Sequence, residues 1–263
     1  MLRCACMHAA KAVLLAALLA GPQVVPHALA APHEINVFTD EIEAPGEVGV
    51  ELHVNYARGR ATPDYPGELP PDRVWRVMPE IVFGLRRHWE MGLHLPTQRD
   101  AEGRLHADGL RLRLKHAWPR EESSACFAGI NVEWSYDEPH LSQDRHGLEL
   151  RGILGWRTEH WLVAVNPILA WVLKGPNKSR KPDLEGSAKI ARKVGGGWAV
   201  GIEHYVGFGP LSDWAPRTEQ DRMLYFVADY EGRSWSLNLG FGAGLTPASD
   251  DKVVKAIIGI PFR

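Results

Sequence analysis

Charged side chains recur at every second position in several stretches of this chain, where they alternate with apolar side chains. Arg111, Arg113 and Lys115 form a basic run of this kind, and Glu90 and Glu133 lie in the stretches before and after it. Because alternate residues of a β-strand share a face, opposite charges on neighbouring strands can form ion pairs. Such a face suits either a constriction that selects solutes by charge or a network that holds a barrel closed.

The polar faces of all these stretches supply the candidate residues for the wall of a solute path. The set is Glu51, Glu80, Glu90, Arg111, Arg113, Lys115, Glu133, Glu149, Arg151, Lys189 and Glu203. Glycines also lie on these polar faces and predict free space beside the strands of the second half of the chain. Their positions are 129, 155, 201, 207, 240 and 242. Any path is therefore expected to follow the glycines.

Three histidines are weak candidates for a metal site. His53, His88 and His94 are predicted to project inward from the first three strands, beside the carboxylates of Glu51, Glu80 and Glu90. Imidazole and carboxylate groups suit a divalent transition metal. No tight ligand motif is present, so the sequence assigns neither a metal site nor a cofactor.

A catalytic serine would need a base within hydrogen-bond reach. His204 is predicted on the apolar face near the outer end of its strand, with Ser212 in the following loop. This pair would suit an enzyme that acts on membrane lipids, and the histidine would equally suit an interfacial position. We assign no catalytic residue.

The elements that carry these side chains are strands. Apolar and polar residues alternate in twelve stretches, and most have the roughly 9–11 residues that a tilted strand needs to cross a membrane. The stretches are 47–56, 73–84, 88–95, 109–118, 126–136, 147–157, 160–173, 184–193, 198–208, 222–230, 233–243 and 253–262. Pro79 and Pro167 lie inside two of them and predict bulges or local breaks.

Connections between the stretches alternate between long and short. An all-β, antiparallel, up-and-down transmembrane barrel has this pattern, with short periplasmic turns and longer outer loops. Twelve strands lie between small filled barrels and wide porins, so we expect a narrow or plugged pore.

Aromatic residues on the apolar faces are predicted to form two belts at the membrane interfaces. They include Tyr56, Trp75, Trp89, Trp118, Trp134, Trp156, Trp161, Trp171, Trp198 and Trp235. The alternative is a soluble barrel or sandwich with an aromatic core, but the sequence offers no helices to cover this outer face.

Three parts follow one another along the chain. Residues 1–30 have the basic start, apolar run and small-residue end of a cleaved signal peptide. Residues 31–46 do not alternate and are interpreted as a periplasmic lead-in or a plug, and residues 47–263 as the barrel. Loss of Arg3 and Lys11 with the leader changes the formal charge from −2 to −4. No basic tract indicates nucleic acid.

The leader, the alternating strands, the aromatic belts and the terminal strand at 253–262 together resemble Gram-negative outer-membrane β-barrel proteins. Residues 78–96, MPEIVFGLRRHWEMGLHLP, and 109–118, GLRLRLKHAW, are similar to uncharacterised transporter barrels associated with aromatic-compound degradation. The resemblance implies an outer-membrane location, contact with outer-membrane lipid and recognition of the last strand by the barrel-assembly machinery. That strand usually ends on an aromatic residue, whereas Arg263 follows Phe262 here.

The expected function is that of a narrow passive transporter or pore for small solutes with a charged lumen. Two alternatives remain open at this point: a lipid-modifying enzyme of the outer membrane, and a closed structural or binding barrel.

Overall fold

A computed structural model of the chain describes residues 33–59, 63–119, 121, 124–179 and 181–262. The predicted signal peptide, residues 1–30, lies outside the described residues. Among the described residues, no helix has the length and apolar character needed to cross a membrane.

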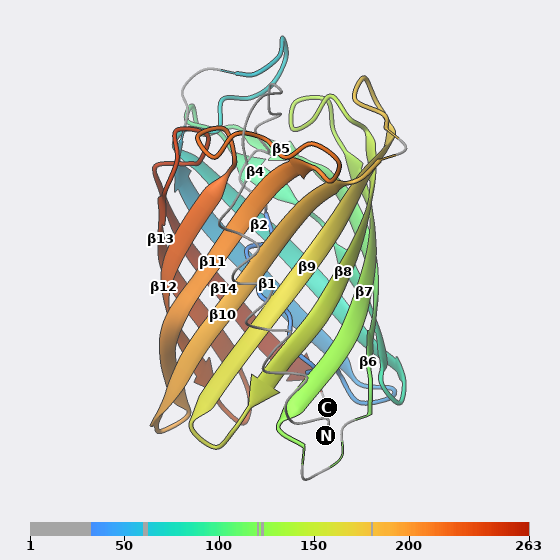
Figure 1. The fold of residues 1–263 in the computed structure, drawn as a ribbon, viewed down its shortest axis with the longest axis vertical. Helices are drawn as coiled ribbons and strands as arrows, with labels where there is room; N and C mark the ends of the chain where they lie inside the picture. Colours follow the sequence, from blue (N-terminus) through green and yellow to red (C-terminus); the bar gives the residue numbers. More distant parts are fainter. Residues whose placement is uncertain (1–32, 60–62, 120, 122–123, 180, 263) are drawn as a thin grey trace.

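A single antiparallel sheet of twelve long strands closes on itself in the described part of the chain (Figure 1). Closure follows because β1 pairs with both β2 and β14. The barrel strands are β1 (Val48–Arg58), β2 (Val74–Arg86), β3 (Trp89–His94), β6 (Gly109–Ala117), β7 (Cys126–Asp137), β8 (His146–Arg157), β9 (Trp161–Lys174), β10 (Asp183–Gly195), β11 (Trp198–Pro210), β12 (Arg222–Glu231), β13 (Ser236–Gly244) and β14 (Lys252–Phe262).

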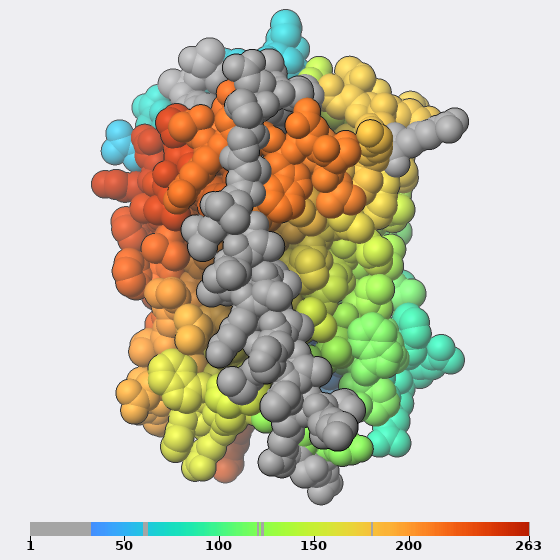
Figure 2. Space-filling model, in the orientation of Figure 1, coloured from blue at the N-terminus to red at the C-terminus, as the bar shows by residue number. Residues whose placement is uncertain are grey.

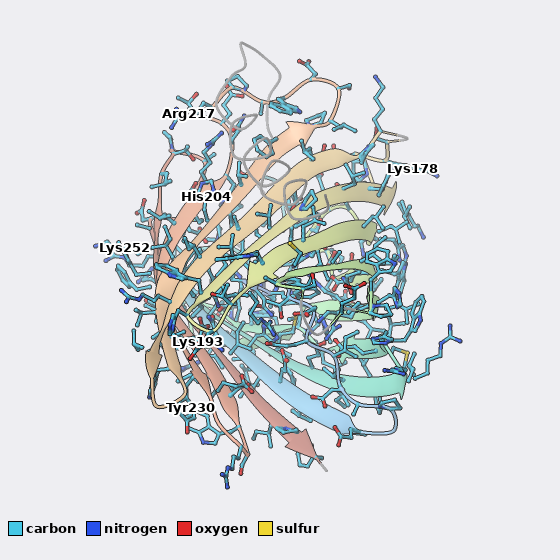
Figure 3. The ribbon with its side chains drawn as sticks, turned by 60° about the horizontal axis from the view of Figure 1, so that its bottom comes forward. Lys178, Lys193, His204, Arg217, Tyr230 and Lys252 are labelled. Atoms are coloured by element: carbon cyan, nitrogen blue, oxygen red, sulfur yellow. The ribbon has the colours of Figure 1, made fainter. Side chains whose placement is uncertain are left out.

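The barrel has a long-loop end and a short-turn end, as predicted. The β2–β3 and β10–β11 connections are two-residue turns, whereas the chain between β1 and β2 and that between β11 and β12 are long loops. The loop between β9 and β10 rises above the rim at the long-loop end (Figure 2). Arg217 and Lys178 lie at this end, and Tyr230 lies at the opposite end (Figure 3).

Two further strands extend the sheet at the long-loop end, where the sequence predicted only a loop. β4 (Thr97–Arg99) pairs with β2, and β5 (Leu105–Ala107) pairs with β4. The turn between them is held by Asp100, which accepts hydrogen bonds from the backbone N–H and the Nε of Arg104. His106 Nε2 lies 2.9 Å from the same carboxylate. The imidazole and the guanidinium hold the pKa of Asp100 below its usual range.

The predicted alternation matches the two faces of the barrel. On β1, His53 and Asn55 are 1% and 2% exposed, whereas Leu52 and Val54 face outward. The outer face is apolar over its whole circumference, and the exposed fraction reaches 68% at Phe226 on β12 and 47% at Val200 on β11. So large an exposed apolar surface is typical of a lipid-facing wall.

The aromatic residues lie near the strand ends. Tyr56 and Trp75 pack at the long-loop end with ring centroids 4.9 Å apart. At the short-turn end, Tyr230 contacts both Trp198 and Trp235, with centroids 5.0 Å and 4.7 Å away. Aromatic pairs therefore lie at both ends of the barrel, and their role as membrane-interface belts stays a prediction.

A bulge or a local break was predicted at each of the two prolines. β2 passes through Pro79 without a register shift, because this residue lies where the partner of β2 changes from β3 to β4. The carbonyl of Pro79 accepts a hydrogen bond from Leu95 N at that junction. At Pro167 the β8–β9 ladder is interrupted locally, but the register is the same on both sides. A local break is therefore present at Pro167 and a bulge at neither proline.

The glycine-lined path predicted along the inner wall is largely filled. A Cβ at Gly155 would overlap the ring of Phe127, and one at Gly242 would overlap the ring of Tyr225. At Gly240 the side chain of Lys255 lies 2.8 Å from the same position. These glycines make room for large side chains of neighbouring strands. Gly207 differs, because its nearest neighbour would be Asp221 Cβ at 4.0 Å.

We expect Gly155→Ala to destabilise the barrel by about 1–3 kcal/mol, since the methyl group overpacks against Phe127. The measurement is the urea midpoint of unfolding in detergent, followed by tryptophan fluorescence. Gly207→Ala is the matched control and should unfold near the wild-type midpoint. Equal midpoints for all three proteins would contradict this packing.

Candidate functional site in the barrel interior

Residues 33–46, which we call the lumen segment, lie inside the barrel along its length. At the long-loop end, His33 Nε2 is 2.6 Å from Oδ2 of Asp108, which precedes β6. At the short-turn end, Gly46 N donates to Gly84 O at 2.8 Å. The segment then turns into β1, so its chain direction is opposite to that of the first strand.

The first and last strands hold two carbonyls of the lumen segment. Asn55 on β1 and Lys255 on β14 are register partners across the closing seam. Asn55 Nδ2 donates to His33 O at 2.6 Å, and Lys255 Nζ donates to Ile35 O at 2.8 Å. The seam of the barrel thus binds alternate residues of the segment.

Phe38 anchors the middle of the lumen segment. Its N–H donates to Asn166 Oδ1 at 2.7 Å, and its carbonyl accepts from Asn166 Nδ2 at 3.1 Å. Its ring lies 4.4 Å from the guanidinium carbon of Arg151, and the cationic groups of Arg113 and Lys115 lie 5.4 Å and 5.3 Å from it. Three cations around one buried ring provide cation–π attraction in a site with little water.

The basic run on β6 meets carboxylates on both sides. Arg113 Nε donates to Glu80 Oε1 and Arg113 Nη1 to Glu90 Oε1, both at 2.6 Å. Arg111 Nη1 lies 3.5 Å from Glu133 Oε1. The structure therefore brings together five of the sequence-predicted wall residues in a buried network across β2, β3, β6 and β7.

Four other predicted wall residues contact the lumen segment, each other or a buried histidine. Lys115 Nζ donates to Glu41 O. Arg151 Nε donates to Glu149 Oε1 at 2.8 Å, and its Nη1 donates to Asn36 O at 3.3 Å. Glu51 lies beside His53, with 3.4 Å between Oε2 and Nε2.

A second buried network spans β10 to β14. Glu203 accepts from Lys255 and from Tyr205 Oη, and its Oε1 lies 3.1 Å from Lys189 Nζ. Lys189 also donates to Asp229 Oδ1 at 2.7 Å. Sequence reasoning found Lys189 and Glu203 but not Lys255 or Asp229. Both missed residues have largely apolar neighbours in the sequence. Their position on the polar face of the strand was the signal that could have identified them.

Two of the three candidate histidines face the interior. His53 and His94 are fully buried, each in a group with two carboxylates. His88 does not project inward, because it lies in the two-residue turn between β2 and β3 with a φ of 70°. It therefore cannot join the other two.

The structure does not join His204 to Ser212. His204, labelled in Figure 3, lies on β11. Ser212 lies in the exposed loop beyond that strand. Ser212 Oγ accepts from Lys181 Nζ at 3.4 Å, rather than from the histidine. The pair suggested by the sequence thus has no catalytic geometry among the described contacts.

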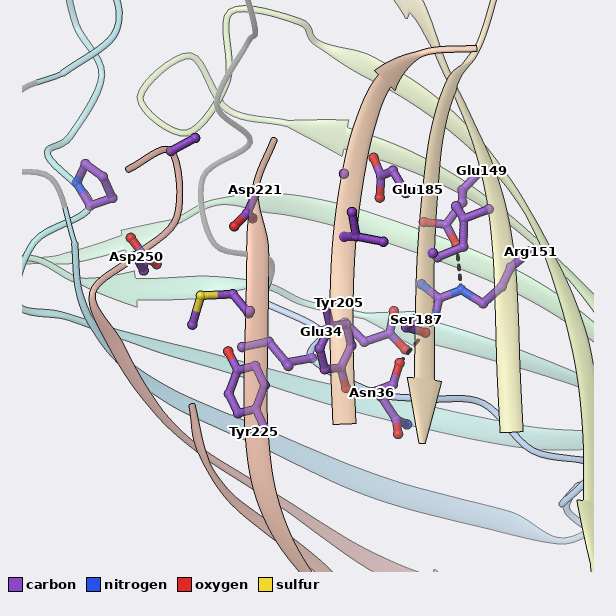
Figure 4. Close-up of a pocket in the computed structure, with 18 of the residues that line it drawn as sticks. Glu34, Asn36, Glu149, Arg151, Glu185, Ser187, Tyr205, Asp221, Tyr225 and Asp250 are labelled. Carbon is purple, nitrogen blue, oxygen red and sulfur yellow. Dashed lines mark hydrogen bonds and ion pairs between the residues drawn. The ribbon is translucent and has the colours of Figure 1, made fainter. Parts of the chain in front are cut away.

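The described residues line two cavities toward opposite ends of the interior. The long-loop chamber, of about 230 Å³, lies between Glu34 and Asn36 of the lumen segment and the wall of β8 to β12 (Figure 4). The short-turn chamber, of about 710 Å³, borders Asn36 to Glu43 and the ends of β10 to β14. Asn36 of the lumen segment lines both chambers, and Phe38 lines the short-turn chamber.

The closed twelve-stranded barrel is similar in fold to solved outer-membrane channels and porins. The COG4313 outer membrane channel from Pseudomonas putida F1 superposes with a TM-score of 0.61 and 11% identity, over 87% of this chain and 100% of that one. The KdgM porin in complex with disordered oligogalacturonate gives 0.56 and 8%, over 82% and 99%. The NanC porin gives 0.54 and 10%, over 81% and 99%. No model of a known protein family and no curated protein matches the chain.

Replacing Glu203 by Gln should destabilise the barrel by about 3–5 kcal/mol, since Lys189 and Lys255 would lose their shared buried carboxylate. Guanidinium unfolding in detergent measures the effect. Glu102→Gln, an exposed carboxylate in the β4–β5 turn, serves as the control and should leave the midpoint unchanged. A wild-type midpoint for Glu203→Gln would show that the buried lysines do not depend on this carboxylate.

Proposed function

We propose that the protein is a narrow passive channel for small solutes in the outer membrane of a Gram-negative bacterium. The observation that carries the proposal is the pair of chambers toward opposite ends of one barrel, both lined by the lumen segment. The fold shared with outer-membrane channels supports it. A wall built only for structural closure would have no need of a chamber at each end.

The chambers differ in charge. The long-loop chamber is lined by five carboxylates and two guanidinium groups, namely Glu34, Glu149, Glu185, Asp221, Asp250, Arg111 and Arg151. The short-turn chamber is lined by many groups of both signs. Acidic linings at a pore mouth attract cations and repel anions. We therefore expect the outer entrance to favour cationic or neutral solutes.

The constriction lies at Phe38 and the three cations around its ring. Solutes that enter the long-loop chamber then meet Arg113, Lys115 and Arg151. A change of sign along the path restricts charged solutes of either kind, so small neutral molecules fit it best. The resemblance to transporter barrels associated with aromatic-compound degradation makes small aromatic compounds the first class to test.

The surroundings of the channel follow from the same proposal. Residues 1–30 would direct export and be removed, and the last strand would be read by the barrel-assembly machinery. The aromatic belts would hold the barrel at the two lipid interfaces. Residues 33–46 would then act as a plug rather than as a periplasmic lead-in.

Deletion of residues 33–46 should raise single-channel conductance in a planar bilayer by about twofold or more, because the segment occupies the cross-section that carries ions. The full mature chain should show a small, steady conductance under the same conditions. Heat-modifiable migration on SDS gels verifies that both proteins are folded. Absence of conductance from both folded proteins would rule out the channel.

Arg113→Gln should shift the reversal potential in a salt gradient toward greater cation preference, since it removes one positive charge from the constriction. Glutamine avoids placing a third carboxylate beside Glu80 and Glu90. Arg217→Gln, in the loop between β11 and β12, is the control and should leave the reversal potential unchanged. If Arg113→Gln behaves like this control, Arg113 does not border the solute path.

A further inference from the structure

Three potential metal ligands from separate parts of the chain meet inside the barrel. They are Glu34 of the lumen segment, His94 of β3 and Glu133 of β7, and one ligand atom of each lies within 4.8 Å of the others. Their exposed fractions are 6%, 0% and 5%. An imidazole and two carboxylates at this separation form a ligand set that divalent transition metals accept.

The group has unmet bonding capacity. Among the described residues, Glu34 Oε1 and His94 Nδ1 are buried without a hydrogen-bond partner. Of the nearby guanidinium groups, Arg113 binds Glu80 and Glu90, and Arg151 binds Glu149. Arg111 lies beside Glu133, with 3.5 Å between Nη1 and Oε1, and leaves Glu133 Oε2 on the side of His94. Two carboxylates in a dry site repel each other unless a cation lies between them.

The imidazole of His94 is oriented as in metal sites. Its Nε2 lies 2.9 Å from Glu80 Oε1, and its Nδ1 points toward Glu133, with 3.7 Å to Oε2. Glu80 is in turn held by Arg113. In metalloproteins a carboxylate commonly accepts the second N–H of a ligating histidine, which fixes the ring and leaves the other nitrogen for the metal.

A cation can reach the group of Glu34, His94 and Glu133 from the long-loop chamber. Glu34 lines the long-loop chamber, together with Glu149, Glu185, Asp221 and Asp250. Figure 4 shows Glu34 among these carboxylates. The potential of such a lining raises the local concentration of cations.

We propose that Glu34, His94 and Glu133 bind a divalent transition metal ion such as Zn²⁺, with water as the remaining ligand. Ligand atoms lie about 2.0–2.2 Å from such an ion, so side-chain shifts of about 1 Å complete the site. The ion ties the lumen segment to β3 and β7 and thereby fastens it in the barrel. The site goes beyond the channel function and does not depend on it.

A second group of potential metal ligands lies nearby and can be compared with the proposed site. Glu51, His53 and Glu80 also place ligand atoms within 4.8 Å of one another. All three belong to β1 and β2, so an ion there would not hold the lumen segment. Glu80 is also already committed to Arg113 and His94.

The test is Zn²⁺ binding to the mature, chelator-treated protein in detergent, without a histidine tag, by isothermal titration calorimetry. We expect one site in the wild type, and an affinity lower by about tenfold or more in Glu34→Gln, as for loss of a metal ligand or its support. Glu41→Gln, which changes another carboxylate of the lumen segment, is the matched control and should bind Zn²⁺ like the wild type. The unfolding temperature should rise with Zn²⁺ in the wild type and in Glu41→Gln, but not in Glu34→Gln.

Because Glu34 lies outside the strands, its substitution leaves the barrel ladder intact, and heat-modifiable migration on SDS gels verifies folding. Wild-type affinity in Glu34→Gln, or no binding by the wild type, would overturn the proposal. So would loss of binding in His53→Gln with retention in Glu34→Gln, which would place the ion at the other group. None of these results depends on conductance, so failure of the channel proposal would be seen separately.

Discussion

Compensation of buried positive charge is the constraint on which the interior of this barrel depends. Lys255, Arg151 and Lys115 each donate to a backbone carbonyl of the lumen segment, at Ile35, Asn36 and Glu41. Breaking a buried ion pair or leaving a charge without its partners costs several kcal/mol. The buried cations of the wall therefore depend on the lumen segment for hydrogen-bond acceptors, and the segment depends on the wall for donors. The segment in turn has no strand partner of its own, so the wall side chains replace the missing ladder.

This mutual dependence explains how the two faces of the sheet differ. Outside, lipid accepts apolar side chains with no need for detailed matching, and the face is uniform. Inside, many buried charges are held in specific networks, such as that of Glu203 with Lys189 and Lys255. The inner surface therefore has regions where charged wall residues contact the lumen segment. The long-loop and short-turn chambers lie outside these contacts.

Period-two alternation was sufficient to predict the closed barrel, its two ends and the inward faces of its strands, because the lipid and the interior demand opposite side chains at successive positions. The lumen segment was harder to place, since its contacts use backbone carbonyls that carry no sequence signal. Glycines such as Gly155 predicted free space, but only the register shows that Phe127 fills it. His53 and His94 were recognised from their face, whereas Glu34 lies in a stretch without periodicity.

The seam between β1 and β14 has a consequence for the order of assembly. Lys255 and Ile35 are 220 residues apart, and the partner of Lys255 across the seam, Asn55, binds His33. These contacts require the first and last strands to be side by side. Before β1 and β14 pair, the lumen segment can be held only by the other strands. Pairing of the last strand with the first therefore also fixes the position of the segment. Closure of the sheet and placement of the lumen segment are thus coupled through contacts that are distant in the sequence.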